Sequence, residues 1–366
     1  MRVLIAPQEF KGSLGASEAA AAIAAGVRKA RPDWQCDLLP LSDGGPGFLD
    51  AIRGAARSDT FAEIVRDPIG RNVLGRLALL RGSRIAIIEA AAANGLHHLA
   101  ADELEPLYAD TFGVGQLITS ASSLTPTRIV VGVGGSATTD GGAGMARALG
   151  ARFTDMAGNE LPAGGAPLAD LARIDWRPPP ELAGVEIVAA TDVTNPLVGA
   201  RGAAHVFGPQ KGANPEQVEQ LEAALVRYAA VLRRSLGVDI AHLPGAGAAG
   251  GLAGGLVAFL GAHIESGFDV VAEATNLRER FAAADIIVTG EGSYDSQSLG
   301  GKGPARMLEM ARAAGKPVVV LAGRSSESDA AVRTLDSLEP ELTRSMERAA
   351  ELLRELAARW AGEFPV

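Results

Sequence analysis

The sequence has few aromatic side chains, a single cysteine and no long uninterrupted hydrophobic run. Phe, Trp and Tyr make up 4% of the 366 residues, which argues against base-stacking surfaces for single-stranded nucleic acid. One cysteine, Cys36, excludes an internal disulfide. The most apolar stretch, Gly245 to Ala262, is rich in Gly and Ala and is soon followed by Glu265 and Asp269. It therefore predicts a buried helix rather than a membrane span.

An excess of positive charge is also absent. The formal net charge is −9, and Lys and Arg are scattered along the chain, so no face is expected to attract a polyanionic backbone. The first residues, MRVLIAPQEF, lack the basic and long apolar segments of a signal peptide. We therefore expect a cytoplasmic protein with neither nucleic acid nor membrane as a partner. The sequence leaves the oligomeric state undetermined.

What the chain does have is enough apolar material for a large core. Hydrophobic residues make up 47% of the 366 residues, a length that predicts two domains. The 45 glycines indicate many tight turns and close approaches of the backbone to a ligand.

Strand, loop and helix alternate at both ends of the chain. Val3–Ala6 predicts a strand that leads to an Ala-rich helix over 17–30, and Leu38–Leu41 predicts a second strand before another helix. Near the C-terminus, 286–289 and 318–321 predict buried strands separated by a helix. Such alternation is typical of a parallel sheet.

Between the two ends the pattern changes. Residues 60–89 contain short apolar runs separated by turns, which predict hairpins and hence a different domain. The predicted fold class is α/β with two domains: a Rossmann-like parallel-sheet domain formed by residues 1–60 plus 270–366, and an inserted α/β domain formed by residues 61–269.

A loop dense in glycine and hydroxyl residues follows the predicted strand at 128–133. It offers backbone N–H groups and three hydroxyls to phosphate oxygens or to a polar substrate, yet it matches neither standard nucleotide-binding glycine motif. A purely structural glycine turn is the alternative. The candidate binding residues in this loop are Gly134, Gly135, Ser136, Thr138, Thr139 and Asp140.

Two loops near the N-terminus are further candidates. Lys11, next to Gly12 and Ser13, supplies a positive charge for a phosphate or a carboxylate, although a solvated surface lysine explains it too. Asp43 precedes Gly44 and Gly45 at the start of a predicted helix, where free N–H groups receive anions. An ordinary Asp N-cap is the alternative there.

Two loops in the second half of the chain carry carboxylates at predicted strand ends. Asp192, with Thr194 and Asn195, follows the apolar run 187–190; an aspartate there can accept a hydroxyl proton or bind Mg²⁺, or it can simply form an Asx-turn. Lys211, shortly after, can neutralise a transferring phosphate.

Glu291 and Asp295 lie in the other loop, with Gln297 nearby and Lys302 before a predicted helix. Carboxylates four residues apart in a loop suit Mg²⁺, and a surface acidic loop is the alternative.

These segments together, in order, resemble the bacterial glycerate kinase family. The segments that carry the resemblance are Ala6–Ser13, Asp43–Gly45, Glu89–Leu96, Gly134–Gly144, Asp192–Pro196, Phe207–Ala213, Gly245–Leu252, and Gly290–Gly292 with Asp295 and Gln297. The resemblance covers nearly the whole chain. It implies an active-site cleft between two domains, with Mg²⁺, ATP as co-substrate and D-glycerate as acceptor.

The resemblance implies a kinase that forms a phosphoglycerate, expected to be 2-phosphoglycerate, and it also implies roles for individual residues. Asp43 or Asp192 is expected to orient or deprotonate the hydroxyl, Lys11 and Lys211 to contact phosphate or carboxylate, and Glu291 with Asp295 to hold Mg²⁺.

The chain also departs from the family pattern. Gln8 and Glu9 stand where the family usually has Asp and Ser, and Pro46 replaces an acidic residue. The segment 290–297 also carries Ser293 and Tyr294 where the family has other residues. Two alternatives therefore stay open: a kinase for a related small hydroxy acid, and a catalytically silent ligand-binding protein on the same fold.

Overall fold

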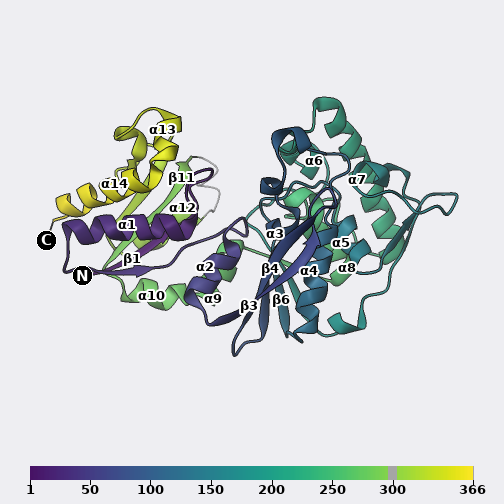
Figure 1. Ribbon diagram of the computed structural model, residues 1–366, viewed down its shortest axis with the longest axis horizontal. Helices are drawn as coiled ribbons and strands as arrows, with labels where there is room; N and C mark the ends of the chain where they lie inside the picture. The colour runs from purple at the N-terminus through teal and green to yellow at the C-terminus, as the bar shows by residue number, and fades with distance from the viewer. Residues whose placement is uncertain (296–302, 366) are drawn as a thin grey trace. The chain divides into compact units, whose positions relative to one another are not determined.

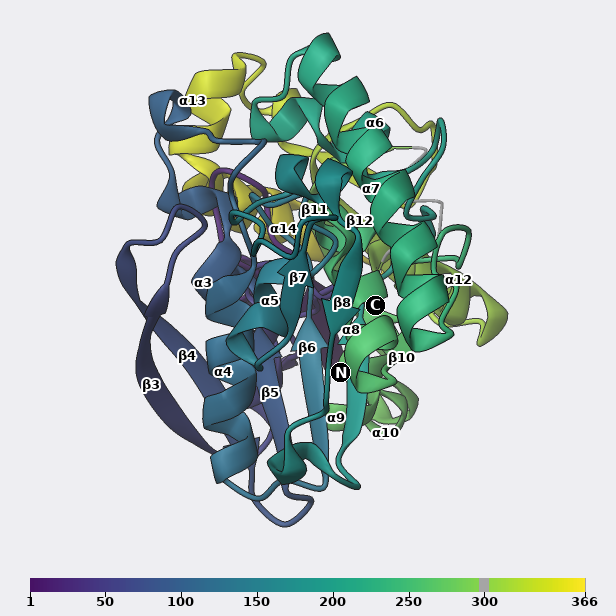
Figure 2. The same ribbon diagram turned by 90° about the vertical axis from the view of Figure 1, so that its right-hand side faces the viewer.

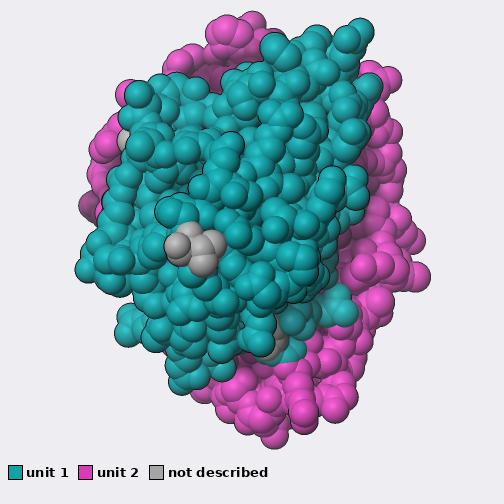
Figure 3. Space-filling model, turned by 90° about the vertical axis from the view of Figure 1, so that its left-hand side faces the viewer, with its two compact units in different colours: residues 1–43, 50–56, 268–366 teal, residues 44–49, 57–267 magenta. Residues whose placement is uncertain are grey.

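The computed structural model describes residues 1–295 and 303–365, so Gln297 and Lys302 lie outside the described residues. The chain divides into two compact units, coloured separately in Figure 3. The first unit contains Met1–Asp43, Asp50–Ala56 and Phe268–Val366, and the second contains Gly44–Leu49 and Arg57–Gly267. The domain boundaries at residues 60 and 270 and the cleft implied by the family resemblance stay predictions.

The first unit is built on a five-stranded parallel sheet to which both chain ends contribute (Figure 1). The strands follow the order β13–β12–β11–β1–β2. Their bounds are β1 Arg2–Pro7, β2 Gln35–Leu38, β11 Ile286–Tyr294, β12 Val318–Ser325 and β13 Val332–Thr334. From β1 the chain continues to one side, whereas β11, β12 and β13 continue to the other. The strand order therefore reverses between β1 and β11, the position where open α/β sheets bind ligands.

Helices cover both faces of this sheet. Helices α1 (Ala16–Ala30) and α14 (Ala349–Glu363) lie side by side and share one apolar core with β1, β11 and β12. Helix α12 (Gly303–Ala313) packs its apolar side against the opposite side of β12. The other helices assigned wholly or mainly to this unit are α2 Phe48–Ala55, α9 Gly267–Ala274, α10 Leu277–Ala283 and α13 Leu342–Glu347.

The second unit contains a six-stranded mixed sheet in the order β10–β9–β6–β5–β4–β3. Strands β3 (Ser58–Arg66) and β4 (Asn72–Leu80) form the hairpin that the sequence predicts, and β5 (Ile85–Glu89) continues antiparallel to β4. From β5 onward the neighbours are parallel: β6 Arg128–Gly132, β9 Glu186–Ala190 and β10 His263–Glu265. A separate two-stranded sheet joins β7 (Arg152–Thr154) and β8 (Arg173–Asp175).

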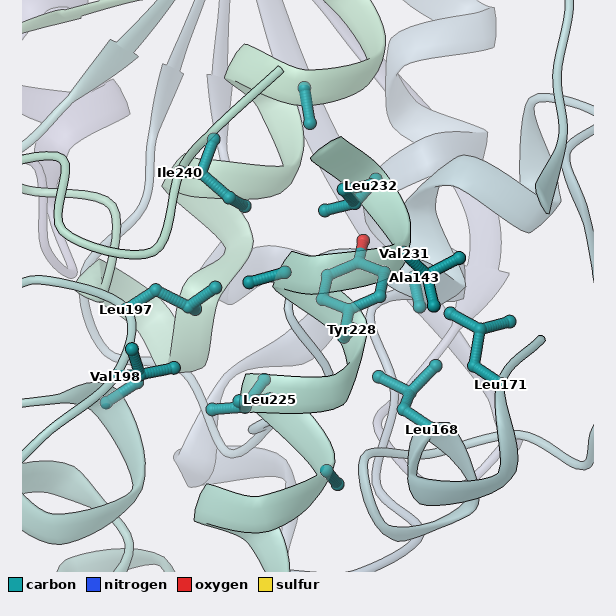
Figure 4. Close-up of a cluster of buried hydrophobic side chains, with 14 of the residues drawn as sticks. Ala143, Leu168, Leu171, Leu197, Val198, Leu225, Tyr228, Val231, Leu232 and Ile240 are labelled. Atoms are coloured by element: carbon teal, nitrogen blue, oxygen red, sulfur yellow. The ribbon is translucent and has the colours of Figure 1, made fainter. Parts of the chain in front are cut away.

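Two cores stabilise the second unit. In one, α4 (Phe112–Ser123) and α8 (Leu252–Leu260) cover a face of the six-stranded sheet (Figure 2). In the other, α7 (Pro215–Leu236) packs its apolar stripe against α6 (Ala203–Phe207), α5 (Ala143–Ala148) and the small sheet. Figure 4 shows part of this core, with Tyr228 of α7 and Ala143 of α5. Helix α7 begins at Asn214, whose side chain accepts the N–H of Gln217 in a capping box, and ends before Gly237 at φ 72°. Local sequence signals predict this helix at both ends.

The segment Gly245–Ala262 is a kinked turn followed by α8 rather than one continuous helix. Ala249 and Gly250 have positive φ angles inside the turn, which breaks the helical hydrogen bonding. Within the described residues, none of the helices combines the length and apolar composition needed to cross a bilayer.

Two predicted boundaries in the first unit differ from the structure. Strand β11 continues through Tyr294, although the sequence predicts that the strand ends at residue 289, because Glu291, Ser293 and Tyr294 pair with β12. Strand β2 ends at Leu38, before Pro40, although the N–H of Leu41 still donates to Pro7 O. Pairing with a strand distant in the sequence thus overrides the local loop signal of Gly290 and Gly292.

Candidate functional site

Three candidate segments of the second unit meet at one edge of its sheet. The register aligns Glu89 of β5 with Gly132 of β6, and Gly132 with Ala190 of β9, so these parallel strands end together. The segments that follow them contain α3 (Ala91–Asn94), the glycine-rich loop and the Asp192 loop. Carboxyl ends of parallel strands are where α/β sheets bind ligands.

The segment around Gly44 packs against this edge. The N–H of Gly134 donates to Gly44 O at 2.8 Å. Gly44 has φ +93°, and a Cβ there would lie 2.2 Å from Ala190 O, so only glycine fits. Pro46 covers Gly135, since a Cβ on Gly135 would lie 2.8 Å from the proline Cγ. The substitution at Pro46 therefore touches the glycine-rich loop directly.

Hydrogen bonds link four buried residues, two of them from the glycine-rich loop, which we call the Lys211 cluster: Asn94, Ser136, Thr138 and Lys211. Lys211 ends a short 3₁₀ helix, Pro209–Lys211, and is 2% exposed. Its Nζ donates to Ser136 Oγ at 3.0 Å and to Thr138 O at 2.5 Å. Asn94 Nδ2 donates to Thr138 Oγ1 at 3.2 Å. Residues far apart in the sequence thus form one polar cluster.

Burial weakens proton binding by Lys211. Loss of solvation lowers the pKa of Lys211 to about 7, although the nearby Asp140 carboxylate acts in the opposite direction. The ammonium has no carboxylate oxygen among its described hydrogen-bond partners. Lys211 therefore changes its charge near neutral pH.

Sequence reasoning did not single out Asn94. It ends α3, immediately after the buried strand β5, and is 1% exposed. Within the described residues, its Oδ1 and the Oγ1 of Thr139 are buried without a hydrogen-bond partner. The available signal was a lone amide directly after the alanine run 90–93, inside the segment Glu89–Leu96 that carries the family resemblance.

Asp140 occupies a different position from the Lys211 cluster. Its side chain is fully buried, and Oδ2 accepts hydrogen bonds from Thr111 N, Thr111 Oγ1 and Gly144 N at 2.8–2.9 Å. Its Oδ1 accepts the N–H of Gly142 at 3.1 Å. These contacts connect the glycine-rich loop to the start of α4.

The Asp192 loop lies next to the glycine-rich loop because β9 pairs with β6. Asp192 is half-buried and Thr194 is exposed. Asn195 is used inside its own loop: its Nδ2 donates to Arg201 O at 2.8 Å, and its carbonyl accepts the N–H of Gly247 at 3.0 Å.

The candidate residues of the first unit gather at the carboxyl ends of its central strands. The N–H of Gln8 donates to Gly290 O, which places the loop after β1 beside the end portion of β11. A Cβ on Gly292 would lie 3.0 Å from Lys11 N. Asp43 lies two residues after Leu41, whose N–H donates to Pro7 O, so it belongs to the same edge.

In the loop after β1, the side chains of Lys11 and Ser13 differ in their contacts. Lys11 is exposed and follows Phe10, whereas the Ser13 hydroxyl donates to Phe10 O at 2.9 Å and closes the turn. Gly12, between them, has φ +76°. The lysine ammonium is therefore the group of this loop that is presented to solvent.

Glu291 and Asp295 offer oxygen ligands of the kind that Mg²⁺ accepts. Glu291 is 7% exposed, and Asp295 Oδ2 accepts the hydroxyl of Ser293 at 3.3 Å. Because β11 is extended through Tyr294, four residues separate their Cα atoms by about 13 Å. That spacing favours one carboxylate acting together with substrate phosphates over a shared two-carboxylate site. Among the described residues, no three His, Cys, Asp or Glu side chains form a metal-binding group.

Asp110, just before α4, has an unusual environment. Burial, with a smaller contribution from the Asp140 carboxylate, raises the pKa of Asp110 to about 6. Its Oδ1 accepts the N–H of Phe112 at 2.9 Å, which an asparagine can also do. A raised carboxyl pKa means that the folded state binds the proton more tightly than the unfolded chain does.

We therefore expect Asp110→Asn to stabilise the protein in a pH-dependent way. The cost of the charged carboxylate is absent below the unfolded pKa near 4 and is complete above pH 6, so the gain should reach about 1–3 kcal/mol at pH 8 and vanish at pH 4. Urea unfolding at both pH values measures it, with exposed Asp170→Asn as the control. An equal effect of Asp110→Asn at both pH values would contradict the assignment.

The fold and the two residue groups define an α/β protein with candidate ligand-binding loops at the carboxyl ends of parallel strands. A model of the glycerate kinase family matches residues 3–363. The chain belongs to the glycerate kinase family, and it is therefore an enzyme of the kinase class.

Individual relatives agree over most of their length. Glycerate 2-kinase of Escherichia coli strain K12 is 43% identical over 324 residues, which are 88% of this chain and 85% of the relative. Glycerate kinase of Bacillus subtilis strain 168 is 40% identical over 333 residues, 91% of this chain and 87% of the relative. A crystal structure of a protein assigned as glycerate kinase 2 of Salmonella typhimurium LT2 matches with a TM-score of 0.81 at 41% identity, covering 99% of this chain and 97% of that one.

Proposed function

We propose that this protein transfers the γ-phosphoryl group of ATP to a hydroxyl of D-glycerate, forming ADP and 2-phosphoglycerate. The observation that carries the proposal, in a chain of this family, is the buried Lys211 ammonium bonded to the glycine-rich loop. A buried cation among hydroxyls and backbone donors binds an anion and neutralises developing negative charge.

The proposed roles follow the placement of the residues within each unit. Asp192 or Asp43 orients the accepting hydroxyl and takes its proton as the oxygen–phosphorus bond forms. Exposed Lys11 contacts phosphate, and Lys211 contacts the other anionic group of the reaction, the carboxylate of D-glycerate. The other residues proposed to bind substrate or phosphate are Ser13, Gly44, Gly45, Gly134, Gly135, Ser136, Thr138, Thr139, Thr194 and Asn195, whereas Asp140 is proposed to hold the glycine-rich loop in place.

A coupled assay that detects ADP tests the function. Purified protein with D-glycerate and MgATP should turn over, EDTA should stop the reaction, and phosphorus NMR should identify the 2-phosphate ester. A panel of small hydroxy acids tests the alternative substrate that Gln8, Glu9 and Pro46 suggest. Binding of D-glycerate or ATP without any turnover would identify a silent binding protein instead.

Mg²⁺ fits this site as a partner of one carboxylate and the nucleotide phosphates, where it would neutralise phosphate charge. We propose Glu291 for this role because Gly290, the preceding residue, lies beside the loop that carries Lys11. Asp295 lies further along β11 and accepts the Ser293 hydroxyl.

We expect Glu291→Gln to raise the Mg²⁺ concentration for half-maximal rate by about tenfold or more, since it loses a charge-assisted contact. Asp295→Asn, the matched variant on the same strand, should change it by less than about threefold. The Mg²⁺-dependent rise in melting temperature with an ATP analogue provides a readout independent of turnover. A larger effect at Asp295 than at Glu291 would reverse the assignment.

A further inference from the structure

The Lys211 cluster, made of Asn94, Ser136, Thr138 and Lys211, offers more hydrogen-bond donors than its own acceptors use. Within the described residues, the ammonium has two acceptors for its three N–H bonds. Ser136 Oγ and Thr138 Oγ1 accept hydrogen bonds, and each hydroxyl still carries a proton to donate. Among the acceptors of the cluster, Asn94 Oδ1 has no partner in the described part of the chain. Buried donors without acceptors are costly, so this surplus points to a ligand that supplies acceptors.

The charge of the cluster is also incomplete. Asp140 is close enough to influence the pKa of Lys211, but its two oxygens accept hydrogen bonds from Thr111, Gly142 and Gly144. A buried cation is stabilised by an anion in direct contact. The cluster therefore has one positive charge, several donors and one acceptor to offer to a ligand.

We propose that the Lys211 cluster is the subsite for the substrate acid. Lys211, Ser136 and Thr138 donate hydrogen bonds to its carboxylate, and Asn94 Oδ1 accepts a hydrogen bond from the 3-hydroxyl, which is not the one phosphorylated. This inference rests on the proposed function and adds to it the position of the acid and the role of Asn94.

A hydroxy acid matches this arrangement better than nucleotide phosphates do. A carboxylate has one negative charge, which one ammonium balances, and it accepts hydrogen bonds without donating any. A triphosphate has several charges and no hydroxyl donor for Asn94. The cluster residues are at most 6% exposed, and Ser136 adjoins the exposed Gly135, so a small ligand needs only a local opening.

Substrate analogues test the subsite on the wild-type protein. D-lactate lacks one hydroxyl, 3-hydroxypropionate lacks the other, and glycerol lacks the carboxylate. As competitive inhibitors against D-glycerate, the two acids should bind at least about 100-fold more tightly than glycerol. D-lactate, which lacks the 3-hydroxyl, should bind about tenfold more weakly than 3-hydroxypropionate, because it cannot donate a hydrogen bond to Asn94 Oδ1. Equal binding of glycerol and the acids would overturn the proposal.

Variants of Asn94 test its role. Asn94→Ala should raise KM for D-glycerate about tenfold and remove the difference between the two acids. Asn94→Asp should raise that KM by about 100-fold or more, because it puts a second negative charge beside the carboxylate. KM for ATP should stay within about twofold. Asn72→Ala, at an exposed position of β4, is the matched control and should change neither value.

The outcomes separate this inference from the proposed function. A rise in KM for ATP with an unchanged KM for D-glycerate would assign the cluster to phosphate, and no change in either would remove Asn94 from the site. If Asn94 variants fail to fold, the analogue series still decides. If the wild type shows no phosphoryl transfer, the proposed function is contradicted. The melting temperature with D-glycerate, MgCl₂ and a nonhydrolysable ATP analogue then tests the subsite by itself: a rise caused by the acid supports the subsite, and no rise with any acid overturns it.

Discussion

We expect Lys211→Met to lower kcat/KM for D-glycerate by about 100-fold or more while making the folded protein more stable at pH 6. The loss of activity follows from removing the ammonium that we propose to pair with the substrate carboxylate, and the loss of one member of such a buried, hydrogen-bonded charge pair costs about 2–5 kcal/mol. The gain in stability follows from removing an ammonium that is 2% exposed and has no carboxylate among its described hydrogen-bond partners. Lys211→Met should therefore lower activity and raise stability, whereas replacing a purely structural lysine would lower stability.

The stability effect should depend on pH in a defined direction. The pKa of Lys211 is lowered from 10.5 in the unfolded chain to about 7 in the folded protein. The folded state therefore binds this proton less tightly, and the resulting penalty is complete below pH 7 and disappears as the pH approaches 10.5. Melting temperatures should show a gain for Lys211→Met at pH 6 that has mostly disappeared at pH 9.5.

Lys316 provides the matched control. Its ammonium donates to two backbone carbonyls, Ala282 O and Ala284 O, but it lies nearer the surface than Lys211. Lys316→Met should shift the melting temperature equally at both pH values and leave kcat/KM unchanged. Full activity of Lys211→Met, together with a pH-independent loss of stability, would show that Lys211 only supports the loop.

The wild-type enzyme should show the same titration in its kinetics. Only the charged form of Lys211 attracts the carboxylate, so KM for D-glycerate should be constant below pH 7 and rise by up to about tenfold per pH unit above it. A bound carboxylate favours the ammonium, so binding at pH 8 should take up a proton, measurable by calorimetry in buffers of different ionisation enthalpy. The Lys211→Met variant should show neither effect.

Elements with complete local signals could be predicted from the sequence. Helix α7 has its cap at Asn214, its apolar stripe and its terminal Gly237 within one continuous segment. The β3–β4 hairpin similarly carries its turn residues between two apolar runs. The parallel arrangement of the strands followed from the alternation of strand and helix at the two chain ends.

Features that depend on distant partners could not be predicted. The sequence indicated Lys211 as a phosphate ligand but not its burial, because Ser136 and Thr138 precede it by 75 and 73 residues. Strand β11 was predicted too short because its last residues are held by β12. The local signal at Asn94 was weak, since an amide after an alanine run becomes informative only once its oxygen, without a partner among the described residues, is seen.

The loss of Asp140 should have the largest effect on stability. The sequence predicts a ligand-binding residue here, but the carboxylate accepts four hydrogen bonds from Thr111, Gly142 and Gly144 in a fully buried position. Each buried donor left without an acceptor costs about 1–3 kcal/mol, so Asp140→Ala should destabilise the protein by about 4 kcal/mol or more. Urea unfolding measures the loss of unfolding free energy, with one m-value fitted to the wild type and the variant together.

Asp155 is a suitable control because its carboxylate also accepts several hydrogen bonds, from Ala157 N and from the backbone and side chain of Asn159, but in an exposed turn. Water can replace those contacts, so Asp155→Ala should cost no more than about 1.5 kcal/mol. Asp140→Asn should be nearly as harmful as Asp140→Ala. An amide has one oxygen, so it can accept from the donors to Oδ2 or from the donor to Oδ1, and its NH₂ group would face the other donors. If instead Asp140→Asn unfolds like the wild type but loses affinity for D-glycerate or ATP, the carboxylate acts on a ligand, as the sequence alone predicted.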